Sequence, residues 1–154
     1  MTADGAMAEV IAACRPEWAM ISDARHPAAA FDDVAQRLTG DLDLATRRVF
    51  RAAIDARERI TTTALGGGIA IPHARMALVG AARIAIARFP AGLDLGARDA
   101  LPVDLVVMLM TREEDHPGHL RLLARVAARL ADRGRRDALR AAEAPAGLVA
   151  AFLA

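Results

Sequence analysis

One short stretch of the chain collects residue types that can handle a transferred phosphoryl group. It begins with three consecutive glycines and continues through the apolar run Ile69–Ile71 to the dipeptide Pro72-His73. A neutral imidazole is a good nucleophile near pH 7 because its pKa lies close by, so His73 is a candidate phosphoryl acceptor. Glycine N–H groups can approach phosphate oxygens with no side chain in the way. We therefore predict that the glycines bind phosphate: Gly66, Gly67 and Gly68.

A charged pair upstream strengthens this interpretation. Arg57-Glu58 offers a guanidinium that can pair with the negative charges of a phosphoryl group. Arg59 and Arg75 are alternative cations, and Arg75 is also a candidate contact for an incoming partner. A lone histidine after an apolar strand more often has a structural or surface role. Here the glycine turn and the Arg-Glu pair favour a functional role for His73.

Two further histidines, His116 and His119, form an H-x-x-H pattern. A zinc site is one interpretation, because the acidic run Glu113–Asp115 offers carboxylate oxygens. Structural zinc requires four ligands and catalytic zinc three, so we favour the interpretation without a metal. The glycine triplet lacks the Lys-Ser/Thr that completes a nucleotide-binding P-loop. We therefore expect no metal, nucleotide or other cofactor.

Apolar segments predict the strands that position these residues. Ile69–Ile71 is short and must be extended before a proline. Arg83–Phe89 alternates in part, as a half-buried strand does. Val103–Met110 is continuously apolar, which is typical of a strand covered on both faces. A short strand is also predicted within Trp18–Ile21.

Helical patterns occupy most of the remaining chain. They predict helices over about 27–38, 44–58, 119–132 and 135–143 and from 147 to the end. The helix starting at His119 has a leucine face, and a second face carries arginines that we interpret as a solvated stripe rather than a docking surface: Arg121, Arg125 and Arg129. Strands interleaved with helices indicate an α/β fold class. We expect a single domain over 1–154, in which helices flank both faces of a small mixed sheet.

Composition narrows the class of protein. The 154 residues are 55% hydrophobic and 25% charged, which excludes intrinsic disorder, and the net charge is +1. This balance gives no basic surface for nucleic acid or an anionic membrane. The sequence has no apolar run near the roughly 20 residues that cross a bilayer, and no secretory signal. Cys14 is the single cysteine and cannot form an internal disulfide. We expect a cytoplasmic protein.

The motifs resemble, in order and spacing, the active-site signature of the type-2 EIIA domains of the bacterial phosphoenolpyruvate-dependent phosphotransferase system. That signature has an Arg-Glu pair, a Ser/Thr pair, a Gly-rich turn and an apolar strand ending in Pro-His. The matching residues are Arg57-Glu58, Thr62-Thr63, the glycine triplet and His73. A second active-site histidine heads the helix after the long central strand, where this chain has His119. The resemblance is strongest over 42–154 and departs at Ala64-Leu65, where a glycine is usual.

The resemblance implies a phosphohistidine phosphotransferase that works as a phosphocarrier. His73 would accept a phosphoryl group from a small, histidine-phosphorylated, HPr-like carrier protein. His119 and Arg57 would be further catalytic residues, and Thr62 and Thr63 would join the glycines around the phosphate. The next acceptor would be a IIB domain or a regulatory target protein.

Several functions remain open from the sequence. A freestanding, nitrogen-regulatory type of IIA protein is favoured over sugar transport, because the chain has no membrane segment and no motif of a fused IIB domain. The alternatives are the IIA component of a fructose- or mannitol-type permease and a regulatory binding module of the same fold that takes no phosphate. A metal-dependent hydrolase using His116 and His119 is a third alternative.

Overall fold

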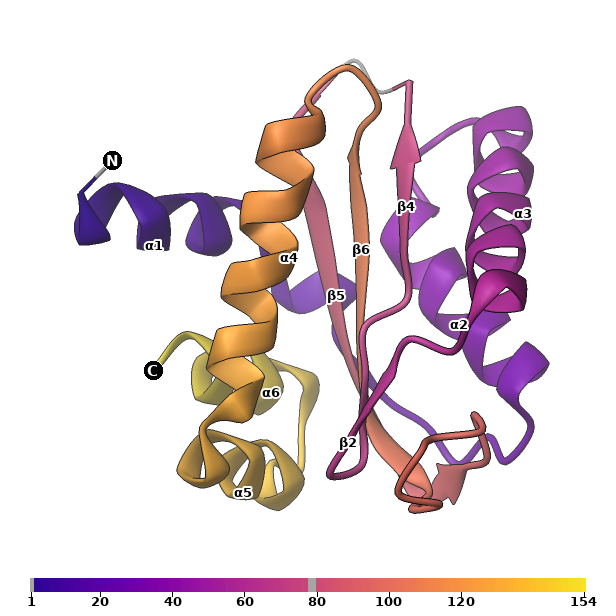
Figure 1. Cartoon of the computed structure of the whole chain (residues 1–154), viewed down its shortest axis with the longest axis vertical. Coiled ribbons are helices and arrows are strands. Elements are labelled where there is room, and N and C mark those ends of the chain that lie inside the picture. Colours follow the sequence, from indigo (N-terminus) through magenta and orange to yellow (C-terminus); the bar gives the residue numbers. More distant parts are fainter. Residues whose placement is uncertain (1, 78–79) are drawn as a thin grey trace.

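A mixed sheet lies between two groups of helices in the computed structural model, which describes residues 2–77 and 80–154 (Figure 1). Among these residues the strands are β1 (Met20–Ile21), β2 (Ala64–Gly66), β3 (Ile69–Ala70), β4 (His73–Met76), β5 (Arg83–Leu93) and β6 (Val103–Arg112). The helices are α1 (Ala3–Ala13), α2 (Pro27–Thr39), α3 (Leu44–Ile60), α4 (His116–Ala131), α5 (Arg133–Ala141) and α6 (Pro145–Leu153), with the short 3-10 helix η1 (Pro16–Trp18). The predicted fold class is confirmed.

β6 is the central strand of the sheet. The strand order is β1-β5-β6-β3-β2, and β4 also pairs with β6. β5 runs antiparallel to β6, whereas β3 and β4 run parallel to it. Residues 105–110 of β6 are each at most 1% exposed, because helices cover both faces. The continuously apolar sequence of this strand follows from that double burial.

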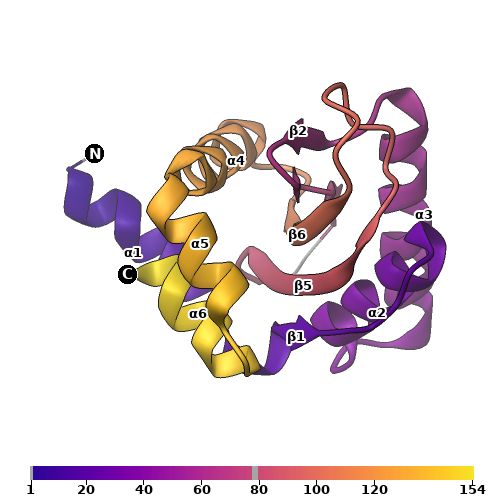
Figure 2. The ribbon, with the colours of Figure 1, turned by 90° about the horizontal axis from the view of Figure 1, so that it is seen from below.

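Alternate side chains of β5 and β6 enter two hydrophobic cores, one on each face of the sheet. Phe50 and Ile54 of α3 share one core with Met108 of β6, and α2 completes it. Leu122 of α4 shares the other core with Val107 of β6, and α1, α5 and α6 complete it. Figure 2 shows the two helix groups on opposite sides of β5 and β6.

The segment predicted as one strand over Ile69–Ile71 is interrupted. β3 ends at Ala70 and a second strand, β4, begins at His73, and both pair with β6. The interruption falls at Pro72, which has no N–H to donate to a sheet. The carbonyl of Pro72 still accepts from the N–H of Leu109, at 2.9 Å. His73 therefore stands at the start of a strand, immediately after a break in the ladder.

Several element boundaries differ from those predicted, and the start of α4 is the one that bears on the histidines. α4 begins at His116, three residues before His119, because the carboxylate of Asp115 caps the helix and accepts from the N–H of Gly118 at 3.0 Å. In the predicted strand over 18–21, Trp18 belongs to η1, and the strand is limited to β1.

The arginines of α4 bind neighbouring elements, so the predicted solvated stripe is wrong for Arg125 and Arg129. Arg125 is hydrogen bonded to the carboxylate of Glu9 in α1, and Arg121 lies 3.9 Å from the same carboxylate. Arg129 donates to the carbonyl of Phe152 in α6, at 2.8 Å. The polar face of α4 therefore ties both α1 and α6 to this side of the sheet.

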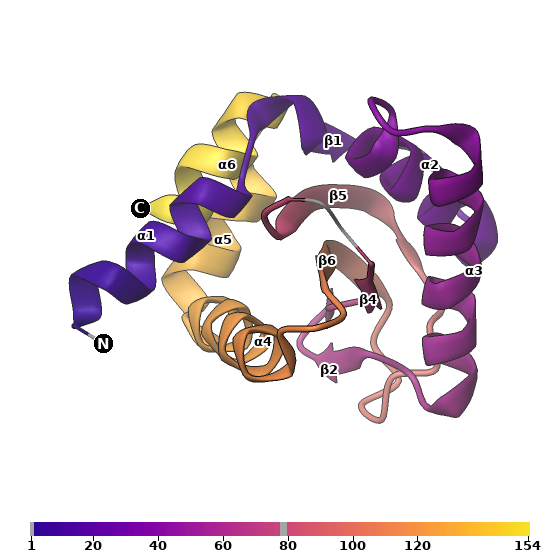
Figure 3. The ribbon, with the colours of Figure 1, turned by 90° about the horizontal axis from the view of Figure 1, so that it is seen from above.

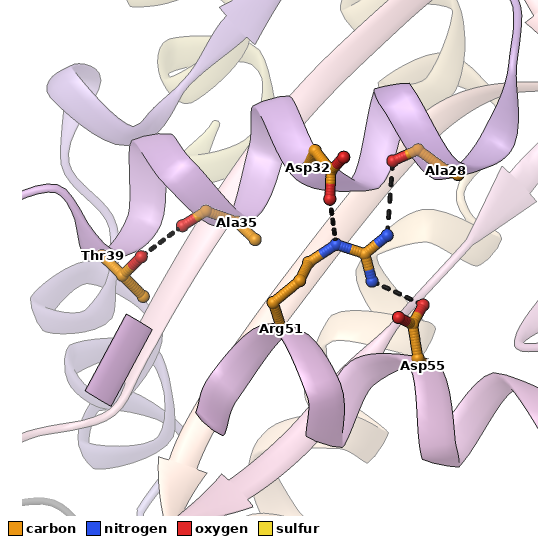
Figure 4. A network of polar contacts seen from close by, with 6 residues as sticks. All are labelled: Ala28, Asp32, Ala35, Thr39, Arg51 and Asp55. Atoms are coloured by element: carbon orange, nitrogen blue, oxygen red, sulfur yellow. Dashed lines mark hydrogen bonds and ion pairs between the residues drawn. The ribbon is translucent and has the colours of Figure 1, made fainter. Parts of the chain in front are cut away.

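Arg51 joins α3 to α2 on the other side of the sheet (Figure 4). Its guanidinium donates to Asp32 of α2 and to Asp55 of α3, each at 2.5 Å, and to the carbonyl of Ala28 at 3.3 Å. A guanidinium is a rigid fork, so three acceptors fix its position well. This network sets the position of α3, whose last turn carries Arg57.

Candidate functional site

A pocket of about 440 Å³ opens between α3, β4 and the first turns of α4. β4 contributes His73 and Arg75, α4 contributes His116 and His119, and α3 contributes Arg57. Figure 3 views this end of the molecule, with β4 between α4 and α3. The structure thus brings together the two histidines and the arginine that the sequence singled out as catalytic.

The ring of His73 is held by the backbone just before it. Its Nδ1 lies 2.8 Å from the carbonyl oxygen of Ile71. A carbonyl only accepts, so Nδ1 of the neutral ring carries the proton and Nε2 keeps its lone pair. Burial lowers the pKa of His73 below the ordinary value of 6.5, and the charge of Arg57 lowers it further, against the raising effects of the Ile71 bond and of Glu58. The ring is therefore neutral at pH 7, with its nucleophilic atom at Nε2.

His119 faces His73 across the pocket. The ring centroids are 5.3 Å apart and the ring planes are inclined by 46°. His119 is only 6% exposed, and its Nδ1 lies 2.6 Å from the hydroxyl of Thr111. Burial lowers the pKa of His119 to about 4, and the charges of His73, Arg75 and His116 add to this effect. His119 is therefore a neutral group that can donate or accept a hydrogen bond in the pocket.

Two arginines give the pocket positive charge. Arg57 lines the pocket and donates from Nη1 to the carbonyl of Thr61, the C-cap residue of α3, at 3.0 Å. Arg75 donates from Nη1 to Nδ1 of His116 at 2.9 Å. His116 thereby helps to hold the side chain of Arg75 in place. Arg75 is the residue that we predicted from the sequence as a candidate contact for a partner.

The threonine pair has structural partners. Thr63 is buried, and its hydroxyl donates to the carboxylate of Glu58. The hydroxyl of Thr62 donates to the carbonyl of Leu95 at 2.7 Å. Neither threonine lines the pocket of His73. Both hydroxyl protons therefore already have acceptors in this structure, and the phosphate contact of the two threonines stays a prediction.

The glycine triplet also lies away from the histidines. Ile69, which follows it, pairs with Leu105, whereas His73 pairs with Leu109, so the two points are roughly 13 Å apart along β6. Gly66, Gly67 and Gly68 have φ of 87°, 65° and 81° and form the turn between β2 and β3. None of them lines the pocket. The structure therefore does not bring the glycines together with His73, and their phosphate binding stays a prediction.

Other groups occupy the glycine turn instead. The N–H of Gly67 donates to the carboxylate of Asp99 at 2.8 Å, and the carbonyl of Gly67 accepts from Arg140 at 2.6 Å. Arg140 also forms an ion pair with Asp104, at 2.8 Å. A Cβ on Gly68 would meet both members of this ion pair at 2.6 Å. Close packing therefore requires a glycine at position 68, and the positive φ of all three residues favours glycine throughout the turn.

Backbone N–H groups in the first turn of α4 are already hydrogen bonded to Asp115. The N–H of Gly118 is bonded to the Asp115 side chain, the N–H of His119 is bonded to the Asp115 carbonyl, and Pro117 has no N–H.

The zinc alternative lacks a set of ligands. Within residues 2–77 and 80–154, no group of three His, Cys, Asp or Glu side chains is placed to hold a metal.

Sequence reasoning did not identify two groups that hold the histidines. The Ile71 carbonyl binds the ring of His73, and the Thr111 hydroxyl binds the ring of His119. Thr111 carries a usable signal, because it is a polar residue at the end of an otherwise apolar strand. A buried polar residue in such a strand needs a partner, and the next segment of the chain carries histidines.

Comparison with known proteins places this chain in a family. Residues 21–154 match the family model described as "Phosphoenolpyruvate-dependent sugar phosphotransferase system, EIIA 2". The chain belongs to this family of type-2 EIIA domains. Within the described residues, no helix is both long enough and apolar enough to cross a membrane.

Two curated relatives are nitrogen regulatory proteins. One, from Pseudomonas aeruginosa, is 40% identical over 87 residues, which are 56% of this chain and 56% of that protein. The other, from Bradyrhizobium diazoefficiens, is 37% identical over 107 residues, which are 70% of this chain and 67% of that protein. The chain thus matches little more than half of the length of the first relative.

Solved structures share the fold over nearly the whole chain. The nitrogen regulatory protein IIA-Ntr from Neisseria meningitidis superposes with a TM-score of 0.82 at 23% identity, covering 93% of this chain and 98% of that one. The IIA mannitol protein of Escherichia coli, solved in complex with phosphorylated IIB mannitol, gives 0.73 at 17% identity, covering 90% and 96%.

Proposed function

We propose that this protein is a phosphocarrier that takes a phosphoryl group on Nε2 of His73. The observation that carries the proposal is the 2.8 Å hydrogen bond between Nδ1 of His73 and the Ile71 carbonyl. It leaves one ring nitrogen with a lone pair, on a half-buried ring that burial keeps neutral at pH 7. The type-2 EIIA family membership supports the same chemistry.

An N–P bond holds the phosphoryl group both before and after the transfer. Nε2 of His73 attacks the phosphorus atom of a phosphohistidine on the donor, a new N–P bond forms, and the N–P bond to the donor breaks. The proton on Nδ1 stays where it is, and the Ile71 carbonyl stabilises the positive charge that the ring acquires. The electron pair of the broken bond returns to the donor imidazole, so the step requires no other reactant.

The surroundings of His73 favour the phosphorylated form. A phosphoryl group brings close to two negative charges into a pocket lined by Arg57 and Arg75. His119, 5.3 Å away between ring centroids, can donate a hydrogen bond to a phosphoryl oxygen. Phosphoryl transfer depends mainly on positioning and charge stabilisation, and these side chains supply both.

Two partners follow from this chemistry. The donor is a small, HPr-like protein carrying phosphohistidine, and the acceptor is a IIB domain or a regulatory target. The Escherichia coli IIA mannitol protein, which shares the fold, has been solved with phosphorylated IIB, and this supports an acceptor of that type. The two nitrogen regulatory relatives support a regulatory role. We propose the cytoplasm as the site of both exchanges.

A labelling experiment tests the proposal. The purified protein is incubated with the general phosphotransferase components and labelled phosphoenolpyruvate. We expect label that is stable to base and lost in acid, as on a histidine. His73→Ala should take no label while remaining folded, and His26→Ala, which changes the exposed N-cap residue of α2, should label like the wild type. Label that persists in His73→Ala would refute the assignment.

A further inference from the structure

We propose that Thr111 is a positioning residue that fixes the proton of His119 on Nε2, the ring nitrogen available to a phosphoryl group on His73. The expected effect on phosphoryl transfer rests on the proposed function, whereas the position of the His119 ring proton can be tested without it. Thr111 ends the buried part of β6, and His119 stands in the second turn of α4, so the contact joins the central strand to the helix that carries the second histidine.

The contact is short and shielded from solvent. The Thr111 hydroxyl lies 2.6 Å from Nδ1 of His119, and the two residues are 3% and 6% exposed. Thr111 also pairs with Arg75 in the ladder between β4 and β6, so its backbone is held beside the strand of His73. Both the strand and the helix are packed in the core, which gives the hydroxyl a defined position relative to the ring.

The direction of the hydrogen bond follows from counting protons. A threonine hydroxyl has one proton, and a neutral imidazole has one protonated nitrogen. In the described part of the chain, His119 Nδ1 is the one hydrogen-bond partner of the Thr111 hydroxyl. If Nδ1 carried the proton, the hydroxyl proton would be buried without an acceptor, which is costly. The favourable arrangement has Thr111 donating to Nδ1, with the ring proton on Nε2.

This arrangement matters because the two tautomers interact oppositely with phosphate. With the proton on Nε2, His119 donates a hydrogen bond to a phosphoryl oxygen. With the proton on Nδ1, the lone pair on Nε2 would face the negative oxygens and repel them. Thr111 does not reach the pocket of His73, which it does not line. It acts through His119, in the way that a second partner of a catalytic histidine sets the tautomer.

The first test reads the tautomer directly. We would record the nitrogen-15 resonances of the His119 ring at pH 7 in the wild type, in Thr111→Val and in Thr111→Ser. The wild type and the serine variant should show a protonated Nε2 and an unprotonated Nδ1. The valine variant has the same shape without the hydroxyl, and its two nitrogens should move toward averaged values as both tautomers become populated. A proton on Nδ1 in the wild type would overturn the proposal.

The second test measures phosphoryl transfer. Thr111→Val should slow transfer to and from His73 by about tenfold, and Thr111→Ser should restore most of the rate. In a His119→Ala background, Thr111→Val should slow transfer no further, because the residue through which it acts is absent. An equal loss in both backgrounds would overturn the proposal, as it would indicate a merely structural role.

A matched control addresses folding. Thr39 is 1% exposed, and its hydroxyl donates to the carbonyl of Ala35 at 2.6 Å, in α2 on the opposite face of the sheet (Figure 4). Thr39→Val also removes a buried hydroxyl but should leave the His119 resonances and the transfer rate unchanged. If the wild type takes no phosphoryl group, the proposed function fails, and the tautomer measurement still decides the role of Thr111.

Discussion

His73 and His119 lie with their ring centroids 5.3 Å apart, and each has its Nδ1 bound to a group outside the space between them. For His73 this group is the Ile71 carbonyl, and for His119 it is the Thr111 hydroxyl. The Nε2 atoms are left for chemistry. One ring can then act as a nucleophile while the other donates a hydrogen bond, although the two side chains are identical.

The first prediction concerns the titration of these rings. The pKa of His73 should lie below 6.5 and that of His119 near 4, because burial penalises the charged ring in both. Proton NMR titration of the ring resonances measures both midpoints. Phosphoryl acceptance should stay constant above pH 6.5 and fall at lower pH as His73 protonates. A midpoint of either ring above 6.5 would contradict the burial argument.

The second prediction concerns stability at low pH. His119 has a pKa of about 4 in the folded protein and 6.5 as its ordinary value, so the unfolded chain binds more protons between these values. Stability should therefore fall as pH drops from 6.5 to 4, by up to about 3 kcal/mol from this residue. Urea unfolding of the wild type and of His119→Gln would show the difference, with a shallower pH dependence in the variant. Parallel curves would contradict the prediction.

The third prediction compares the effects of Arg57 and Arg59, both in α3, on phosphoryl acceptance. Arg57 lines the pocket of His73, whereas Arg59, two residues along, does not. Arg57→Ala should slow phosphoryl acceptance by roughly 10- to 100-fold, because a positive charge beside the transferred group is lost. Arg59→Ala should change the rate by less than about twofold, and Arg57→Lys should recover part of it. Equal effects of the two alanine variants would show that net charge, rather than position, matters.

The fourth prediction concerns the glycine turn. Gly68→Ala should destabilise the protein by roughly 2–4 kcal/mol, because a Cβ would lie 2.6 Å from Arg140 and Asp104 and φ is 81°. Gly80→Ala has no atom within 4 Å of its Cβ and should be nearly neutral in stability. The folded fraction of Gly68→Ala should take phosphoryl groups at the wild-type rate. A loss of transfer rate without a loss of stability would indicate that the glycine turn contributes to phosphoryl transfer at His73.

The sequence was sufficient to predict the main elements of the fold. The uninterrupted apolar run of β6 and the amphipathic pattern of α3 identified the strand and a helix that frame the pocket. The pairing of His73 with His119 and Arg57 was also predicted, but through the family resemblance. No periodicity places a residue of β4 beside a residue of α4, because the two elements meet only when both have packed against β6.

The glycine turn shows why proximity in sequence misled us. Gly68 is close to His73 along the chain, but an extended strand advances about 3.3 Å per residue and separates them. The groups that the turn contacts, Asp99, Asp104 and Arg140, come from distant segments. Their convergence depends on tertiary packing, which local patterns do not encode.

The missing rung at Pro72 has a consequence for how this domain could change over evolution. Pro72 has no N–H to add to the ladder, and the Ile71 carbonyl just before it bonds the imidazole of His73 instead of another strand. Proline also keeps Ile71 extended, so any other residue at position 72 would loosen the backbone that places the Ile71 carbonyl beside the ring. Substitutions of Pro72 should therefore affect phosphoryl transfer at His73 more than the stability of the sheet.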